Sequence, residues 1–119
     1  MSIRHLLTHT SGLIDYEDVI PPGTTAQLHD ADVLRLLETE SRRYFPPGKS
    51  YCYNNSGYSL LALIVGRASG EDFAAYLRKR IFLTLGRRAS GAFDGGVYRV
   101  ADRAYGYASA PPGWVRSVR

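Results

Sequence analysis

A run of apolar residues near the middle of the chain predicts a central helix. Residues 60–65 contain no charged side chain, and a helix that is apolar on every side is typical of one buried within a protein. We expect this helix to cover residues 56–68 and to end at Gly70, because glycine accepts the left-handed conformation that often follows a helix. Asn55 or Ser56 is expected to cap its first turn with a side-chain oxygen.

The N-terminal residues predict a short amphipathic helix. Ser2 can cap it, and Ile3, Leu6 and Leu7 have the i, i+3, i+4 spacing of one buried face. Gly12 is expected to end this helix in a left-handed conformation. The sequence therefore predicts a short first helix with one buried face, followed by a bend at Gly12.

Two more helices are expected on either side of the central one. The earlier one begins at Asp30 or Asp32 and ends near residues 41–43. Its inward residues are expected to be Val33, Leu34, Leu36 and Leu37. The later one begins at Asp72, continues through Ile81, and closes between residues 82 and 86.

The remaining segments show no helical pattern. Residues 13–29 predict an irregular surface segment, because acidic residues and a Pro-Pro-Gly sequence interrupt any period. Residues 97–100 and 104–108 are expected to be short extended pieces. The Pro-Pro-Gly sequence at residues 111–113 breaks the chain, and residues 114–119 look like the start of a further element.

The composition fits one small domain and argues against several classes of function. Apolar side chains make up 45% of the 119 residues, which is ordinary for a globular protein. The net charge of +4 comes from short, separate basic groups rather than one stripe, so we expect no nucleic-acid partner. No apolar stretch of about 18 residues is present, so no membrane span is expected. The N-terminus shows no signal peptide, and the compartment stays open.

A tight turn and a group of polar and aromatic residues precede the central helix. Pro46-Pro47-Gly48 sets the turn, and Tyr51-Cys52-Tyr53-Asn54-Asn55-Ser56-Gly57-Tyr58 follows it. This order places a site at the positive end of the helix dipole. The aromatic residues Tyr44, Phe45, Tyr51, Tyr53 and Tyr58 could line a substrate cleft, an interpretation that the sequence leaves open.

These residues resemble the Tyr-x-Asn motif of class C β-lactamases and related penicillin-binding serine hydrolases. The matching residues are Phe45-Pro46-Pro47-Gly48, Tyr51, and Tyr53-Asn54-Asn55-Ser56-Gly57-Tyr58. Upstream, residues 3–13 resemble the helix-and-turn signature of the same family. Downstream, residues 69–70 and 76–86 continue in matching order, so the resemblance covers roughly residues 2–107.

The resemblance implies a fold and a set of roles. The chain would be a mainly α fragment, the helical region of the α/β serine β-lactamase and penicillin-binding fold, and would lack most of the antiparallel sheet. Residues 1–119 would form one partial domain. Tyr53 would be the catalytic base, and Asn55 would bind and orient the substrate through its amide. The alternative for this pair is a tyrosine at the edge of the core and a helix cap.

Two other motifs of that family are absent from the sequence. The residues three positions before Lys49 and Lys79 are Pro46 and Tyr76, so there is no Ser-x-x-Lys, and neither Lys-Thr-Gly nor His-x-Gly occurs. The parent reaction would transfer an acyl group from a small-molecule amide or ester to serine, followed by hydrolysis. This chain is expected to be inactive, to use no cofactor and to self-associate through exposed apolar surface. The alternative is a non-catalytic helical binding module or a truncated remnant.

Other reactive side chains have simpler structural interpretations. His5 and His9 have the i, i+4 spacing of a zinc pair, but the glutamate of zinc proteases is missing. We therefore expect hydrogen bonding around a helix end and no metal. Ser11 is expected to form a turn, and Cys52, which as a single cysteine excludes an internal disulfide, to be structural and half-buried. The acidic residues Asp15, Glu17 and Asp18 are expected to form a solvated loop.

Overall fold

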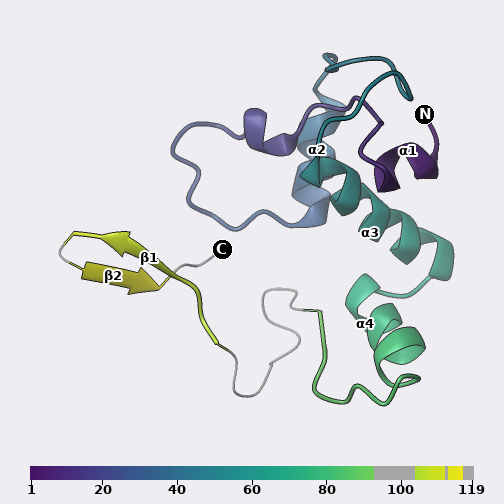
Figure 1. The fold of residues 1–119 in the computed structure, drawn as a ribbon, viewed down its shortest axis with the longest axis vertical. Coiled ribbons are helices and arrows are strands. Elements are labelled where there is room, and N and C mark those ends of the chain that lie inside the picture. The colour runs from purple at the N-terminus through teal and green to yellow at the C-terminus, as the bar shows by residue number, and fades with distance from the viewer. Residues whose placement is uncertain (93–103, 112, 117–119) are drawn as a thin grey trace. The chain divides into compact units, whose positions relative to one another are not determined.

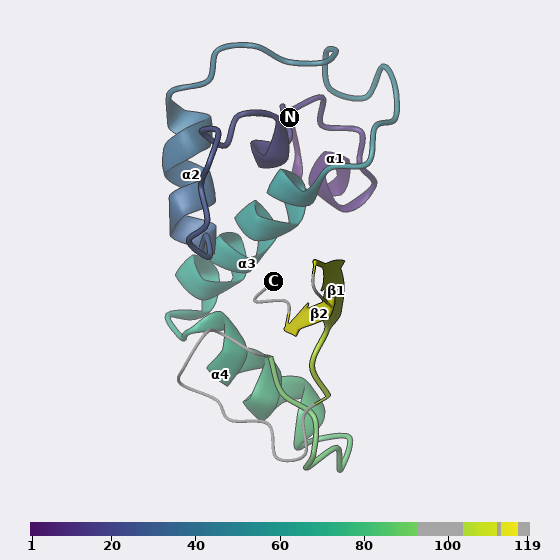
Figure 2. The same cartoon turned by 90° about the vertical axis from the view of Figure 1, so that its left-hand side faces the viewer.

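The computed structural model describes residues 1–92, 104–111 and 113–116, and it divides into two compact units, Met1–Phe73 and Ala74–Arg119. In the first unit, α1 (Ile3–Leu7) and α2 (Asp30–Glu38) both pack against α3 (Asn55–Ser69), as Figures 1 and 2 show. A short 3₁₀ helix, η1 (Tyr16–Asp18), contacts α2 and α3. The helical character predicted from the sequence is therefore confirmed for this unit.

Helix α3 has nearly the predicted bounds but a different cap. It begins at Asn55 and ends at Ser69, and Gly70 follows in the left-handed conformation with φ of 69°, as predicted. The cap was expected at Asn55 or Ser56, and this expectation is wrong. Asn54 is the capping residue, because its backbone is extended and its side-chain oxygen accepts the N–H of Gly57.

Helix α3 is not buried on every side in this chain, which agrees with the exposed apolar surface expected from the sequence. Ala62 is buried, whereas Ile64 is 37% exposed and Leu60 and Leu61 are only half-buried. Only α1, α2 and the short η1 pack on α3 among the described elements. Three short elements cover part of the circumference of a helix, so the rest of its apolar surface stays open to solvent.

Helix α1 is present, but its predicted buried face is only partly correct and its predicted stop at Gly12 is wrong. Leu6 is buried, while Ile3 and Leu7 are both more than half exposed. The helix ends at Leu7 with Thr8 as its C-cap, and the residue after the cap, His9, has a positive φ of 55°. Gly12 therefore does not end the helix.

Gly12 instead allows two segments to approach each other closely. It has φ of 72°, and a Cβ at this position would lie 1.9 Å from the carbonyl oxygen of Phe45. Its own carbonyl accepts the N–H of Tyr44 at 2.8 Å, and Leu13 forms an isolated antiparallel bridge with Arg43. Only glycine fits this contact, because the left-handed conformation and the missing side chain are both required.

Helix α2 begins at Asp30, one of the two predicted starts, with His29 in the capping position. The carboxylate of Asp32 accepts the N–H of His29 at 2.8 Å, and this bond lowers the pKa of Asp32. Val33 is buried and Leu34 is exposed, so the predicted inward face is right for Val33 and wrong for Leu34. The expected irregular segment before α2 contains one short ordered piece, η1.

The described residues of the second unit include the predicted fourth helix, apart from its first residue, Phe73, and a hairpin. Helix α4 (Phe73–Leu77) continues as a π-helical turn, η2 (Arg78–Phe82), in which Leu83 N–H donates to the carbonyl of Arg78. Strands β1 (Tyr107–Ala110) and β2 (Gly113–Arg116) pair antiparallel, and Ser109 pairs with Trp114. Of the extended piece expected at 104–108, residues 107–108 belong to β1, which continues to Ala110. Residues 114–116 of the expected further element belong to β2. The piece expected at 97–100 lies outside the described residues.

None of the helices in the described parts of the chain is both long enough and apolar enough to cross a membrane.

Candidate active site

Asn54 is fixed by three hydrogen bonds at the start of α3. Its Oδ1 accepts the Gly57 N–H at 2.8 Å, and its Nδ2 donates to the carbonyl of Leu13 at 2.9 Å. Its backbone N–H donates to Nδ1 of His9 at 3.2 Å. The residue is only 2% exposed, and a buried amide is stable when its donors and acceptors are paired. Asn54 therefore anchors the centre of the Tyr-x-Asn motif.

Tyr53 and Asn55 flank this anchor on the more exposed side of the chain. Side chains alternate in direction along extended backbone, and Asn54 is extended with φ of −155° and ψ of 114°. Tyr53 is accordingly 63% exposed and Asn55 is half-buried. The buried middle residue thus holds two accessible functional groups at the positive end of α3.

His9 contacts the motif through both its backbone and its ring. Its carbonyl accepts the N–H of Cys52 at 3.0 Å, and its Nδ1 accepts the N–H of Asn54. Because Nδ1 is the acceptor, the neutral imidazole carries its proton on Nε2. His9 therefore binds the loop on both sides of Tyr53.

Three of the five candidate cleft residues gather around the His9 ring. The Tyr58 ring stacks on it with centroids 5.1 Å apart, and the Tyr53 ring lies 4.6 Å away at an angle of 35°. Tyr51 meets the same ring edge-on at 6.0 Å. The hydroxyl of Tyr58 also donates to the carbonyl of Leu7 at 3.1 Å. The imidazole is thus the centre of an aromatic cluster that includes Tyr53.

The acidic loop is bound to the start of α3 rather than merely solvated. Asp15 Oδ2 accepts the backbone N–H of Asn55 at 2.6 Å, and Asp15 Oδ1 accepts that of Glu17 at 3.3 Å. Glu17 in turn accepts a hydrogen bond from Nδ2 of Asn55 at 3.3 Å. Carboxylates are favoured at a helix N-terminus, where backbone N–H groups lack partners within the helix. Any other group that accepts from the Asn55 amide must compete with Glu17.

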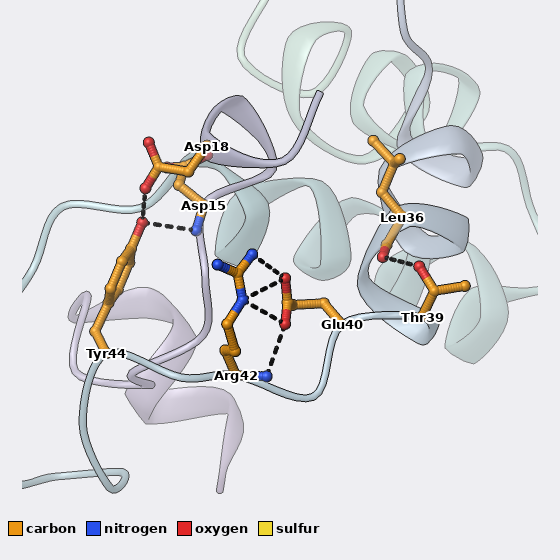
Figure 3. Close-up of polar contacts among 7 residues, drawn as sticks. All are labelled: Asp15, Asp18, Leu36, Thr39, Glu40, Arg42 and Tyr44. Atoms are coloured by element: carbon orange, nitrogen blue, oxygen red, sulfur yellow. Dashed lines mark hydrogen bonds and ion pairs between the residues drawn. The ribbon is translucent and has the colours of Figure 1, made fainter. Parts of the chain in front are cut away.

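Tyr44 belongs to this acidic loop and not to the aromatic cluster. Figure 3 shows its hydroxyl between the carboxylate of Asp18 and the backbone nitrogen of Asp15. The Asp15 N–H donates to this oxygen at 3.1 Å, and the hydroxyl donates to Asp18. Partial burial, and then the bond to Asp18, raise the pKa of Tyr44. Tyr44 therefore ties the acidic loop to the segment that follows α2.

Ser56 supports the same loop from inside the protein. It is fully buried, and its Oγ accepts the N–H of Tyr16 at 2.7 Å. Ser11 is also buried, and its Oγ accepts the N–H of Leu13 two residues later. The predicted turn-forming role of Ser11 is confirmed, and so is the half-buried position of Cys52.

The two histidines with zinc-like spacing each use a ring nitrogen in local hydrogen bonds. His5 Nδ1 accepts the N–H of Ser2 at 3.3 Å, as His9 Nδ1 does for Asn54. This confirms the expected hydrogen bonding around the helix end. Within the described ranges, no three His, Cys, Asp or Glu side chains lie together in a way that would hold a metal ion.

The central position of His9 and the contacts of Asp15 were missed in the sequence. Local spacing related His9 only to His5, four residues earlier, whereas its partners Asn54 and Tyr58 lie more than 40 residues away. The one local signal was Asn54 itself, which stands three residues before Gly57 and can cap a helix.

Comparison with known proteins gives consistent matches over almost the whole chain. The family model described as Beta-lactamase matches residues 1–118. Penicillin-binding protein 4* of Bacillus subtilis (strain 168) is 35% identical over 112 residues, which are 90% of this chain and 25% of that protein. The chain therefore spans about a quarter of the length of this relative.

Solved structures match at the level of the fold. The penicillin binding protein from Bacillus halodurans aligns with a TM-score of 0.79 and 36% identity, covering 98% of this chain and 37% of its own. D-amino acid amidase from Ochrobactrum anthropi SV3, complexed with L-phenylalanine amide, aligns with a TM-score of 0.76 and 28% identity. That alignment covers 97% of this chain and 33% of the amidase.

Proposed function

Since this chain belongs to the serine β-lactamase and penicillin-binding protein family, we propose that it supplies the Tyr-x-Asn part of a serine hydrolase site. In this proposal Tyr53 is the general base and Asn55 orients the substrate. The observation that supports it is the placement of an exposed Tyr53 next to a buried Asn54 that is held by three hydrogen bonds. Such support holds a reactive side chain in one position without covering it.

The proposed reaction is acyl transfer followed by hydrolysis. A serine hydroxyl attacks the carbonyl carbon of an amide or ester, and Tyr53 accepts its proton. The leaving amine or alcohol departs with a proton, and water then hydrolyses the acyl-enzyme. Asn55 would hold the substrate's own amide through its carboxamide group, which is both donor and acceptor.

The proposed substrate class is a small-molecule amide. Among the similar proteins, one is a D-aminopeptidase of Cereibacter sphaeroides and another is a D-amino acid amidase that was solved with L-phenylalanine amide. Exposed aromatic rings at Tyr51, Tyr53 and Tyr58 offer apolar contacts beside the polar groups of the motif, a combination typical of small-molecule sites.

We also propose that this chain is inactive by itself and that it lacks most of the antiparallel sheet of the family fold. The sequence contains no Ser-x-x-Lys, Lys-Thr-Gly or His-x-Gly, so an activated serine nucleophile is missing. The same absence favours the second candidate, a non-catalytic helical module or truncated remnant. The two candidates make different predictions for a hybrid protein that contains the missing motifs. Tyr53 contributes to catalysis there if the first candidate is right, and it does not if the second is right.

A hybrid enzyme tests the catalytic proposal. Residues 1–118 replace the matching segment of the Bacillus halodurans penicillin binding protein, so that segments from that protein flank this chain. In an active hybrid, Tyr53→Phe should lower kcat by roughly 10²- to 10⁴-fold, the usual contribution of a positioned general base. This corresponds to about 3 to 5 kcal/mol of activation free energy.

Tyr51→Phe is the matched control, because it removes the same hydroxyl from the exposed neighbour. It should leave kcat within about twofold. Asn55→Ala should raise KM, because a contact between the protein and the substrate is lost. If Tyr51→Phe lowers kcat as strongly as Tyr53→Phe, or if neither variant has an effect, the proposed role of Tyr53 is wrong.

The unmodified chain provides the complementary measurement. It should form no covalent adduct with a fluorescent penicillin or an ester probe, as read by intact-protein mass spectrometry. A near-stoichiometric adduct on any serine would show that a nucleophile exists within the chain, and the proposed inactivity would be wrong.

A further inference from the structure

His9 has an unusual backbone conformation for its residue type. Among the described residues, it is the one non-glycine residue with a positive φ, at 55°. A side-chain-bearing residue in this region costs of order 1 kcal/mol or more, and such residues gather at functional sites. The position is tolerated because the surrounding contacts fix it: the His9 N–H donates to Leu6, and its carbonyl accepts from Cys52.

This conformation directs the imidazole to the peptide that joins Tyr53 to Asn54. Nδ1 lies 3.2 Å from the Asn54 nitrogen, and the ring centroid lies 4.6 Å from that of Tyr53. On the same ring, Tyr58 stacks at 5.1 Å. One side chain thus contacts both the backbone and the ring of the proposed base.

We propose that His9 is a positioning residue that holds Tyr53 in place by accepting the Asn54 N–H and packing against the Tyr53 ring. This inference rests on the proposed role of Tyr53. Tyr53 is mostly exposed, so its own side chain has little surrounding protein to fix it. The position of Tyr53 therefore depends on how its backbone is held. The Asn54 N–H, in the peptide group that follows Tyr53, is the donor that His9 binds.

The chemistry of the position explains the residue type. The site needs a planar ring against Tyr53 and Tyr58 and, in the same side chain, a hydrogen-bond acceptor two bonds beyond Cβ. Imidazole provides both when Nδ1 is unprotonated. Asparagine could place an acceptor oxygen close to the same point and tolerates a positive φ, but it has no aromatic ring.

The full chain can be tested by residue-resolved amide hydrogen exchange. His9→Gly keeps the left-handed backbone without strain and removes the side chain, whereas His9→Asn restores an acceptor. The Cys52 N–H is an internal control, because it donates to the backbone carbonyl of His9, which both variants retain. His5→Ala is the matched external control, because His5 also accepts a backbone N–H through Nδ1 but contacts the N-terminus of α1.

The proposal expects exchange at Asn54 to become at least about tenfold faster in His9→Gly, since the amide loses its acceptor. His9→Asn should recover most of this protection, and His5→Ala should leave Asn54 within about twofold of the unmodified chain. Three outcomes would overturn the proposal: unchanged exchange at Asn54 in His9→Gly, no recovery in His9→Asn, or equal acceleration at Cys52, which would mean that the loop unfolds. None of these readouts uses activity, so this result is independent of the Tyr53→Phe kinetics.

Discussion

Asp15 accepts the backbone N–H of Asn55 at 2.6 Å, across 40 residues of sequence. This bond attaches the acidic loop to the first residue of α3 and places a negative charge at the positive end of that helix. It was not visible in the sequence, where Asp15 was one of three acidic residues in a segment without a pattern. The relationship makes Asp15 a structural residue whose removal has a measurable cost.

Asp15→Ala is expected to lower the free energy of unfolding by about 1.5 to 3 kcal/mol, the range for hydrogen bonds to a charged group. Asp15→Asn keeps an acceptor oxygen without the charge and should cost less. Urea unfolding followed by circular dichroism measures both. Glu38→Ala is the control, because it removes an exposed carboxylate from α2 and should change stability by less than about 0.5 kcal/mol. Equal losses for Asp15→Ala and Glu38→Ala would contradict this role.

Gly12→Ala should be among the most damaging single substitutions in the chain. The new Cβ would lie 1.9 Å from the Phe45 carbonyl oxygen, at a φ that already disfavours alanine. We expect loss of the folded state or a cost above about 4 kcal/mol, because the two segments must separate.

Gly23→Ala separates steric overlap from backbone strain. Gly23 has a similar φ of 82°, but a Cβ there would meet nothing within 4 Å. Its cost should therefore be limited to about 1 to 2 kcal/mol of left-handed strain. Thermal melting of the two variants side by side gives the comparison, and similar melting temperatures would count against the close approach at Phe45.

Glu40 should titrate at unusually low pH. Hydrogen bonds from the Arg42 side chain, at 2.6 and 3.0 Å, and from its backbone N–H lower the pKa of Glu40 from 4.5 to about 2, and Figure 3 shows this group. Because the folded pKa is depressed, the stabilisation is fully present above pH 4.5 and is lost as the pH falls through 2.

Carboxyl-carbon NMR titration measures this pKa directly. Arg42→Ala should move the Glu40 midpoint upward toward 4.5, since all three side-chain hydrogen bonds from Arg42 disappear. Arg35→Ala should leave it unchanged, because Arg35 pairs with Asp32. A Glu40 midpoint near 4.5 in the unmodified chain would show that the ion pair with Arg42 does not form in solution.

The chain is expected to self-associate at micromolar concentration. Ile3 and Leu7 on α1 and Ile64 on α3 are all exposed, and exposed apolar surface of this kind drives association. Size-exclusion chromatography with light scattering should report a mass above 13.2 kDa. Ile64→Lys should shift the population toward the monomer. A monomer that melts cooperatively at all concentrations tested would refute the expectation.

Local rules predicted which segments are helical, and they predicted the bounds of α3 most closely. The bounds of α3 and the stop at Gly70 follow from an apolar run and a glycine, which act within one or two turns. The capping residue was placed one or two positions too late, because Asn54, Asn55 and Ser56 all have suitable side chains. What selects Asn54 is its extended backbone and its bond to Leu13, and neither can be read from neighbouring residues.

The resemblance supplied the proposed site residues, Tyr53 and Asn55, but it did not predict the contacts that support them. The Tyr-x-Asn pattern identifies Tyr53 and Asn55 through a resemblance, whereas His9, Asp15 and Ser56 hold the loop through bonds that span 40 residues or more. The elements that cover α3 were not predicted, for a related reason. An apolar run indicates that a helix needs cover, but it does not say which elements supply it.

The hydrogen bonds between residues 13–16 and residues 54–56 also determine how the chain can fold. Each of them closes a loop of about 40 residues, and the entropy lost in closing such a loop comes before any gain from contact. The first unit therefore depends on non-local contacts although its named elements are helices, and helical proteins usually fold fast through local contacts. A peptide of residues 50–70 alone would form some helix but would leave Tyr53 unsupported. In the full chain, the rate of refolding should be limited by the formation of contacts between residues 13–16 and residues 54–56.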